Sequence, residues 1–248
     1  MPKALSKTQQ TRLDRVKVIL PILKETYPHA KCSLNFTTPL ELLVATILSA
    51  QCTDDRVNIV TKSLFKKYKS PKAYASAKPE DLEKDIQSTG FYRNKAKSLR
   101  AMASSLIEQH NGQVPQTMDE LTHLAGVGRK TANVVLGNAF GQNIGITVDT
   151  HVTRLSERLG LTSNTDAVKI EQDLIPLVPQ EDWTLWSHLL IHHGRAICQA
   201  RKPKCQECPL LPHCPAGHKL IKAAAQATTA PPTKPRSSAR NKPTAPPV

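Results

Sequence analysis

Apolar residues along most of this chain recur at spacings of three and four, and no stretch alternates apolar and polar positions for long. Such spacing places apolar side chains on one face of a helix, whereas alternation would indicate a strand. The pattern therefore predicts an all-α protein, and Pro21 should kink or split the first helix because it lacks an N–H. The expected helices span 9–26, 39–50, 55–68, 79–87, 92–109, 118–124, 129–140, 150–159, 166–177 and 181–193.

The helical pattern ends near residue 219. From there to the C-terminus the sequence is rich in Ala, Pro, Thr and basic residues, and it contains no acidic and no aromatic residue. Such a composition cannot bury enough apolar surface to offset the entropy of ordering. We therefore predict a disordered basic tail over 219–248.

The charge balance indicates a polyanionic partner, because the 248 residues carry a formal net charge of +14. Nucleic acid and an anionic membrane surface would both fit this charge. The longest apolar runs, such as LELLVATILSA, are far shorter than the ~20 residues that span a bilayer. The first residues also lack the apolar core of a signal peptide. We expect no membrane association, and we expect a cytoplasmic, nucleoid-associated protein of bacterial type.

Two glycines separate two predicted helices in the segment LAGVGRKTANVVL. Thr117 and Glu120 have the spacing of a capping box, which predicts that the first helix begins at Met118. Gly126 and Gly128 then break it. Free N–H groups at the start of the second helix suit a phosphate oxygen, which would give a sequence-independent grip on nucleic acid. An ordinary corner between two helices explains the same glycines.

Lys130 follows this turn and has two interpretations, as a counter-charge for phosphate or as a nucleophile. A nucleophilic lysine must first lose its proton, and burial, the positive end of a helix and the neighbouring Arg129 would each favour the neutral amine. Asp149, in the segment VDTHV, stands where an apolar stretch ends and a helix begins. It is either an N-cap or a rigid anion that stabilises a cationic transition state or relays a proton.

A cluster of cysteines near the C-terminus predicts a metal site. Four of the six cysteines have the spacing C-x6-C-x2-C-x5-C, while Cys32 and Cys52 stand apart. Four thiolates suit either zinc or a [4Fe–4S] cluster, and spacing alone does not choose between them. Disulfides are the weaker interpretation for a cytosolic protein. The clustered residues are Cys198, Cys205, Cys208 and Cys214.

Basic residues accompany the cysteines in the sequence and are expected to decorate their loop. The bound metal would then fix the shape of a basic surface that meets DNA, although a solvated run of charge is the alternative. The basic residues concerned are Arg195, Arg201, Lys202 and Lys204.

Taken together, the glycine turn with its lysine, the VDTHV segment and the cysteine loop resemble the endonuclease III family of helix-hairpin-helix DNA glycosylases. The resemblance runs from about residue 10 to about 218. It implies an all-α helix-hairpin-helix glycosylase fold with two domains and a DNA-binding cleft between them. A six-helix barrel with the hairpin motif would cover 32–143, and an iron–sulfur cluster domain would combine 1–31 with 144–218.

The resemblance also implies roles for individual residues. Lys130 matches the Schiff-base nucleophile of the family and Asp149 its catalytic aspartate, while the four clustered cysteines match the ligands of a [4Fe–4S] cluster. Gln51 resembles the residue that fills the gap left by the flipped nucleotide. Phe91 lies at the tip of the segment that resembles the wedge loop. Without the family, Gln51 is a polar residue at a helix end and Phe91 belongs in the core.

The implied activity is that of a bifunctional DNA glycosylase and AP lyase of base-excision repair. Such an enzyme removes oxidised pyrimidines from duplex DNA through a lysine Schiff base and nicks the abasic site by β-elimination. Its partner would be double-stranded DNA that contains damaged pyrimidines or abasic sites, and we expect a monomer. Two alternatives are a non-catalytic DNA-binding protein with structural zinc and a monofunctional adenine-type glycosylase. The latter would lack Lys130.

Overall fold

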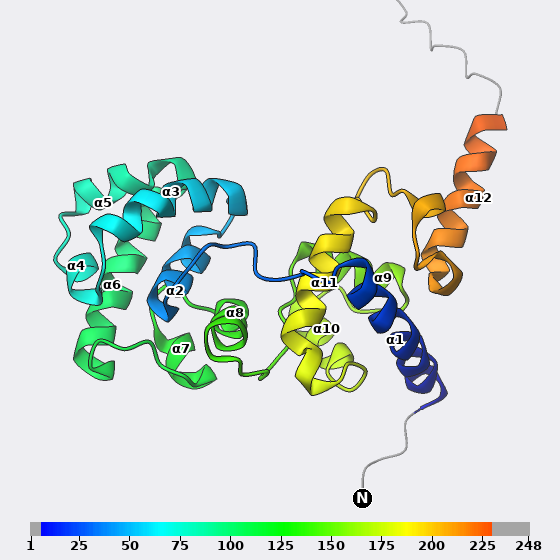
Figure 1. Cartoon of the computed structure of the whole chain (residues 1–248), viewed down its shortest axis with the longest axis horizontal. Coiled ribbons are helices and arrows are strands. Elements are labelled where there is room, and N and C mark those ends of the chain that lie inside the picture. The colour runs from blue at the N-terminus through cyan, green and yellow to red at the C-terminus, as the bar shows by residue number, and fades with distance from the viewer. Residues whose placement is uncertain (1–5, 230–248) are drawn as a thin grey trace, which may run out of the picture.

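The computed structural model describes residues 6–229, and these residues form helices and loops with no strand among them. The all-α prediction is therefore confirmed. The part of the predicted tail beyond residue 229 lies outside the described residues. Figure 1 shows two lobes. The chain passes from one lobe to the other along residues 27–38 and returns along residues 141–149.

The first lobe is built from consecutive helices packed around one apolar core. Its buried residues run from Leu34 to Leu136, and α6 packs against both α4 and α5. Its last two helices, α7 and α8, form the pair that flanks the two glycines. The helices are α2 (Pro39–Leu48), α3 (Asp54–Lys67), α4 (Pro71–Ala75), α5 (Pro79–Ile86), α6 (Tyr92–His110), α7 (Met118–His123) and α8 (Arg129–Phe140).

The second lobe combines the N-terminal helix with the C-terminal part of the chain. Its separate apolar core runs from Val16 to Leu210 and centres on Trp186, which is fully buried. The domain limits expected from the resemblance stay a prediction, and the two separate cores support them. The helices are α1 (Lys7–Thr26), α9 (Thr150–Arg158), α10 (Ala167–Leu174), α11 (Trp183–Ala196) and α12 (Pro215–Thr229).

Local sequence signals set several of the helix boundaries. The N-cap predicted at the start of α7 is confirmed, because the backbone N–H of Glu120 donates to Thr117 Oγ1 at 3.3 Å. Pro21 does not split the first helix, because α1 continues through this residue. The alternative, a kink at Pro21, stays a prediction. Pro21 lies on the exposed side of α1, so its ring takes no space in the core, although it removes one backbone hydrogen bond from the helix.

Two helices were absent from the sequence prediction. The helix α4 has five residues, which is too short to show a periodic pattern, although Ser70 caps it and Pro71 stands at its first position. The prediction that disorder begins at residue 219 is wrong, because α12 continues to Thr229. The segment is rich in alanine, the best helix former, and this propensity outweighs its lack of large apolar residues.

The described helices include none whose length and hydropathy would let it cross a membrane.

A pair of substitutions on α6 tests the position of the first core. Leu99 is fully buried, whereas Ile107 on the same helix is 43% exposed. We expect Leu99→Ala to lower the free energy of unfolding by about 2–5 kcal/mol, because it removes buried methyl groups and leaves a cavity. Ile107→Ala should change it by about 0.5 kcal/mol or less. Urea unfolding followed by circular dichroism measures both, and similar decreases in the two variants would contradict the assigned face of α6.

Candidate active site and metal centre

The two glycines of the hairpin lie in different local environments. Gly126 has φ +80°, and a Cβ there would lie 3.0 Å from the Cβ of Ser98 on α6, so both backbone and space require glycine. Gly128 is the N-cap of α8 in extended conformation, and nothing lies within 4 Å of where its Cβ would be. No side chain caps the first N–H groups of α8. The start of this helix is therefore open to an incoming anion.

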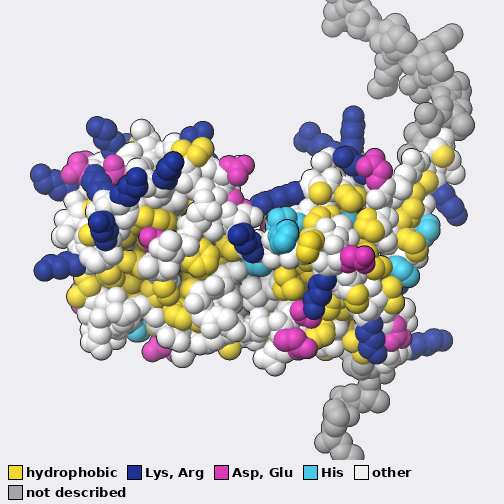
Figure 2. Space-filling model, viewed as in Figure 1, with side chains coloured by type: hydrophobic (Ala, Val, Ile, Leu, Met, Phe, Trp, Pro, Cys, Tyr) yellow, Lys and Arg dark blue, Asp and Glu magenta, His cyan; other side chains and the backbone are white. Residues whose placement is uncertain are grey.

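Lys130 and Asp149 line the same cleft, which has a volume of about 540 Å³. Lys130 comes from the first turn of α8 in the first lobe, and Asp149 stands directly before α9 in the second. The Lys130 side chain is exposed and that of Asp149 is half-buried. Figure 2 shows basic and histidine side chains at the notch between the lobes. The structure thus brings together the two residues that the sequence singled out for chemistry.

The carboxylate of Asp149 caps α9. Its Oδ1 accepts a hydrogen bond of 2.8 Å from the backbone N–H of Val152. Within the described residues, no hydrogen bond uses its Oδ2. The capping bond fixes the carboxylate while leaving one oxygen for another partner. The N-cap interpretation is confirmed, and the catalytic role stays a prediction.

Arg129 differs from the expectation that it stands as a free cation beside Lys130. Its guanidinium holds both oxygens of Glu171 on α10, at 2.7 and 3.1 Å, and this pairing raises the pKa of Arg129. Glu171 is buried and also accepts from Asn133 Nδ2 at 3.0 Å. The charge of Arg129 is therefore largely offset, and Lys130 itself is exposed. The structure therefore surrounds Lys130 with neither burial nor an unpaired neighbouring cation, and places it in the first turn of α8.

Gln51 and Phe91 lie at two exposed turns of the first lobe. Both have a left-handed backbone although neither is glycine, with φ 53° at Gln51 and φ 48° at Phe91. The interpretation of Phe91 as a core residue is wrong, because its side chain is 62% exposed. The insertion of both side chains into DNA stays a prediction.

Arg195 does not lie on the cysteine loop, and this part of the sequence prediction is wrong. Its guanidinium bonds Asp54 Oδ2 at 2.6 Å and Ser33 Oγ at 2.9 Å, so it joins the second lobe to the first inside the cleft. No local pattern in the sequence indicates these partners, because they are far away along the chain. The three basic residues that do lie on the loop, all exposed, are Arg201, Lys202 and Lys204.

Sequence reasoning missed other polar residues that line the cleft, among them His151 and His188. The ring of His188 contacts Asn138 Oδ1 through Nε2 at 2.7 Å, and burial, helped by the nearby His192, lowers the pKa of His188 to about 4. Burial also lowers the pKa of His151. His188 lies on α11, whose pattern is dominated by apolar residues, and its partner Asn138 lies on α8 in the other lobe. The sequence alone gives no sign of this pairing.

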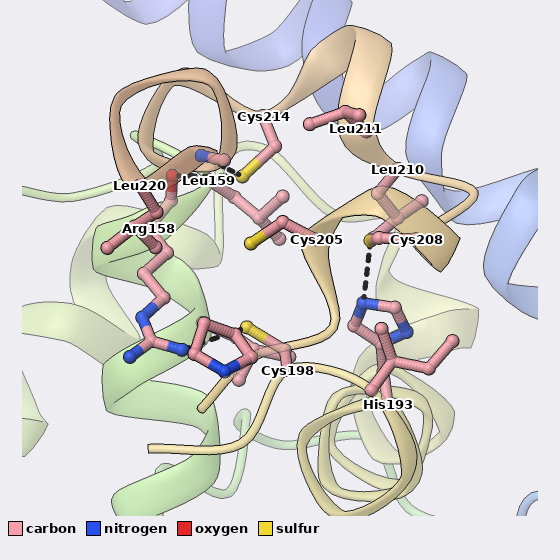
Figure 3. Close-up of a pocket in the computed structure, with 14 residues that line it drawn as sticks. Arg158, Leu159, His193, Cys198, Cys205, Cys208, Leu210, Leu211, Cys214 and Leu220 are labelled. Atoms are coloured by element: carbon pink, nitrogen blue, oxygen red, sulfur yellow. Dashed lines mark hydrogen bonds between the residues drawn. The ribbon is translucent and has the colours of Figure 1, made fainter. Parts of the chain in front are cut away.

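The four clustered cysteines surround one cavity in the second lobe. Figure 3 shows their sulfur atoms pointing into a common space that apolar side chains also line. Burial and the neighbouring thiols raise the pKa of Cys208 to about 11, and they raise the pKa of Cys205 and of Cys214. A buried thiolate needs a compensating positive charge. The donor set therefore fits a cationic metal centre.

The four thiols line one cavity within the described residues, so they could act together as ligands of a single metal centre.

Backbone and side-chain donors support the sulfurs. Arg158 Nη1 lies 3.2 Å from Cys198 Sγ, and Gly217 N lies 3.3 Å from Cys214 Sγ. The buried His193 contacts Cys208 Sγ through Nε2 at 3.4 Å. Such donors stabilise thiolate charge around a metal centre.

Comparison with known protein families gives two matches within the chain. Residues 44–180 match the HhH-GPD superfamily of base excision DNA repair proteins. Residues 198–214, which begin and end at clustered cysteines, match the iron–sulfur binding domain of endonuclease III.

Curated relatives match over most of the chain. Endonuclease III of Synechocystis is 54% identical over 212 residues, which cover 86% of this chain and 97% of that protein. Endonuclease III of Bacillus subtilis is 49% identical over 85% of this chain and 96% of that protein. Endonuclease III of Escherichia coli K12 is 43% identical and covers 77% and 90%.

Two solved structures have the same fold. A non-covalent endonuclease III–DNA complex superposes with a TM-score of 0.81 at 44% identity, covering 88% of this chain and all of that one. A trapped covalent intermediate of endonuclease III with DNA, an estranged-adenine complex, superposes with a TM-score of 0.80 at 44% identity and the same coverage. These matches confirm the sequence-based resemblance and the predicted fold class.

The half-buried His188 predicts a pH dependence of stability. Its pKa is about 4 in the folded protein against 6.5 when exposed, so between these values the unfolded chain binds a proton that the folded chain does not. Stability should therefore fall as pH falls through this window. From pH 7 to pH 5.5, we expect the free energy of unfolding to drop by about 1 kcal/mol more in the unaltered protein than in His188→Gln.

Urea unfolding at the two pH values measures this difference. His29→Gln, which changes an exposed histidine, should keep the pH dependence of the unaltered protein. Equal dependence in His188→Gln and the unaltered protein would contradict the lowered pKa of His188 in the folded state.

Proposed function

Because this chain belongs to the endonuclease III family, and is a base-excision DNA glycosylase with AP lyase activity that carries a [4Fe–4S] cluster, we propose that Lys130 and Asp149 perform its chemistry. We further propose that oxidised or ring-damaged pyrimidines in duplex DNA, together with abasic sites, are its substrates. The chain would act on them as a monomer in the bacterial cytoplasm.

One observation carries this proposal. An exposed lysine of one lobe and a half-buried aspartate of the other line a single cleft of about 540 Å³. The position of the cleft between the lobes suits a base that has left its stack. A damaged base pairs weakly, which lowers the free energy needed to flip it out.

The proposed reaction begins at the sugar of the flipped nucleotide. The neutral amine of Lys130 attacks C1′, the bond from C1′ to the base breaks, and the base leaves with the bonding electrons and takes up a proton. The carboxylate of Asp149 stabilises the positive charge that develops on the sugar and accepts a proton from the amine. Opening of the sugar ring then gives an imine between Lys130 and C1′.

The imine makes the second step possible. It withdraws electrons and so acidifies the proton at C2′, which a base removes. The electron pair of the broken C2′–H bond forms a C2′=C3′ double bond conjugated with the imine, as the C3′–O bond breaks and the 3′ phosphate leaves with the electrons of that bond. Hydrolysis of the imine returns free Lys130. An adenine-type enzyme without the lysine would displace the base with water instead, so no imine would form and the strand would not be nicked.

The hairpin and the cysteine loop would hold the DNA backbone. The open N-terminus of α8, with Gly126 and Gly128 before it, offers backbone N–H groups to a phosphate. Arg129 pairs with Glu171 yet keeps 46% of its side chain exposed, so its guanidinium can still face a phosphate. Cys198, Cys205, Cys208 and Cys214 would ligate the [4Fe–4S] cluster, whose proposed contribution is to fix the shape of the loop that carries the three basic residues.

Borohydride trapping tests the role of Lys130. On a duplex with one oxidised pyrimidine, the unaltered protein should form a covalent adduct and nick the strand, whereas Lys130→Ala should form no adduct. Asp149→Asn keeps the capping oxygen and should lower the single-turnover rate by about 10²- to 10⁴-fold. Lys97→Ala, an exposed lysine of α6, is the matched control and should trap normally. An adduct that persists in Lys130→Ala would assign the nucleophile to another residue.

A second test separates the cysteines of the loop from its basic residues. We expect the purified protein to be brown and to contain iron, and Cys205→Ser to lose both. The triple variant R201A/K202A/K204A should keep its iron. It should bind DNA more weakly. A plot of the logarithm of its DNA association constant against the logarithm of the salt concentration should also be less steep, by about one unit of slope for each phosphate that these side chains neutralise in the unaltered protein. Iron retained at full level in Cys205→Ser, or an unchanged slope in the triple variant, would contradict the corresponding assignment.

A further inference from the structure

Lys95, in the first turn of α6, is a buried lysine without an acidic partner. Lys95 is 5% exposed, and none of the ion pairs among the described residues includes it. Lysine is almost never fully buried unless it is paired, because removing its charge from water is unfavourable. Burial accordingly lowers the pKa of Lys95. Such an unfavourable position calls for a reason.

The amine of Lys95 joins the backbones of two separate turns. Its Nζ donates to the carbonyl oxygen of Leu48 at 2.9 Å and to that of Thr89 at 2.8 Å. Leu48 is the last residue of α2, three residues before Gln51. Thr89 ends the short 3-10 helix Gln87–Thr89, two residues before Phe91. One side chain therefore holds the segments that lead into both exposed turns.

The main chain of Lys95 strengthens this connection. Its N–H donates to the carbonyl oxygen of Phe91 at 3.0 Å. Lys95 thus contacts the Phe91 turn at Thr89 through its side chain and at Phe91 through its main chain, and it reaches the Gln51 turn through the side chain alone. Removing the amine would leave two buried carbonyl oxygens without this donor while keeping the main-chain contact.

Both turns need such support. Gln51 and Phe91 adopt left-handed conformations that are unfavourable for any residue other than glycine. Conformations of this kind persist only where the surrounding structure fixes them. Both side chains nevertheless point to the exterior, and α2 also packs against α8, which carries Lys130. The distance between the two exposed tips is therefore set from inside the lobe, next to the helix of the nucleophile.

We propose that Lys95 is a positioning residue that fixes the Gln51 and Phe91 turns relative to each other, so that both side chains enter the DNA together when a base is extruded. This inference rests on the proposed function. If Lys95 has this role, it should matter most at the step in which a base is extruded from the stack. An abasic site has no base to extrude, so its cleavage should depend much less on Lys95.

The test compares two substrates in single-turnover reactions. One duplex carries an oxidised pyrimidine, and the other carries a preformed abasic site at the same position. In Lys95→Met, which keeps the length of the side chain but removes its donors, we expect base excision to slow about tenfold. Cleavage of the abasic site should slow much less. Lys97→Met on the same helix should leave both rates unchanged.

A double-mutant cycle distinguishes positioning from general destabilisation. If Lys95 acts through the Phe91 turn, the effects of Lys95→Met and Phe91→Ala on excision should overlap, so that the double variant is little slower than the slower single variant. Equal slowing of both substrates by Lys95→Met, or fully additive effects in the cycle, would overturn the proposal. Failure of the unaltered protein to excise the base at all would instead overturn the proposed function.

A second variant keeps the test decisive if Lys95→Met does not fold, which thermal unfolding would reveal. Lys95→Arg keeps the charge and the donors but moves them along a longer, planar group. It should slow excision more than abasic-site cleavage, by a smaller factor than expected for Lys95→Met. Equal effects on both substrates would again overturn the proposal.

Discussion

The arrangement of the cleft depends on one buried carboxylate. Glu171 belongs to the second lobe and is 4% exposed, yet its oxygens accept hydrogen bonds from Arg129 and Asn133 of the first lobe. A buried carboxylate left without its hydrogen-bond donors would be unfavourable, so this interaction favours one placement of the lobes. Arg129 is the first residue of α8, and Lys130 follows it. The same interaction therefore sets where the amine stands relative to Asp149.

Other contacts between the two sides of the cleft are also polar. The side chain of Asn138 meets His188, that of Asn143 accepts from the main chain and hydroxyl of Thr184, and Arg195 reaches Asp54. Each lobe has its own apolar core. Apolar packing therefore stabilises each lobe, whereas polar contacts set the position of one lobe relative to the other. A hydrogen bond contributes about 1 kcal/mol, but its directionality fixes orientation more sharply than apolar contact does. Polar contacts thus suit a cleft that must present two reacting groups at defined positions.

Much of the fold could be predicted from the sequence because its helices have regular apolar faces and clear ends. The residues with a recognisable local pattern, such as Lys130 after its glycines and Asp149 at a helix start, were identified as well. Lys95, Glu171 and Arg195 were not assigned their partners, because these are distant in sequence and are chosen by packing. A buried polar residue in an apolar helix has no periodic signal of its own. The helix α4 was missed because five residues are too few to show a periodic pattern, and α12 because its lack of large apolar residues was given more weight than the helix propensity of its alanines.

The left-handed turns at Gln51 and Phe91 have a consequence for the protein when DNA is absent. Glycine adopts such a backbone without strain, so the chain holds at each tip a residue that makes its free form less stable than glycine would. At these two positions, the stability of the free protein and the presence of a long side chain therefore favour different residues. A smooth, relaxed surface there would fold more readily, but it would have no side chain with which to occupy the space that an extruded nucleotide leaves behind.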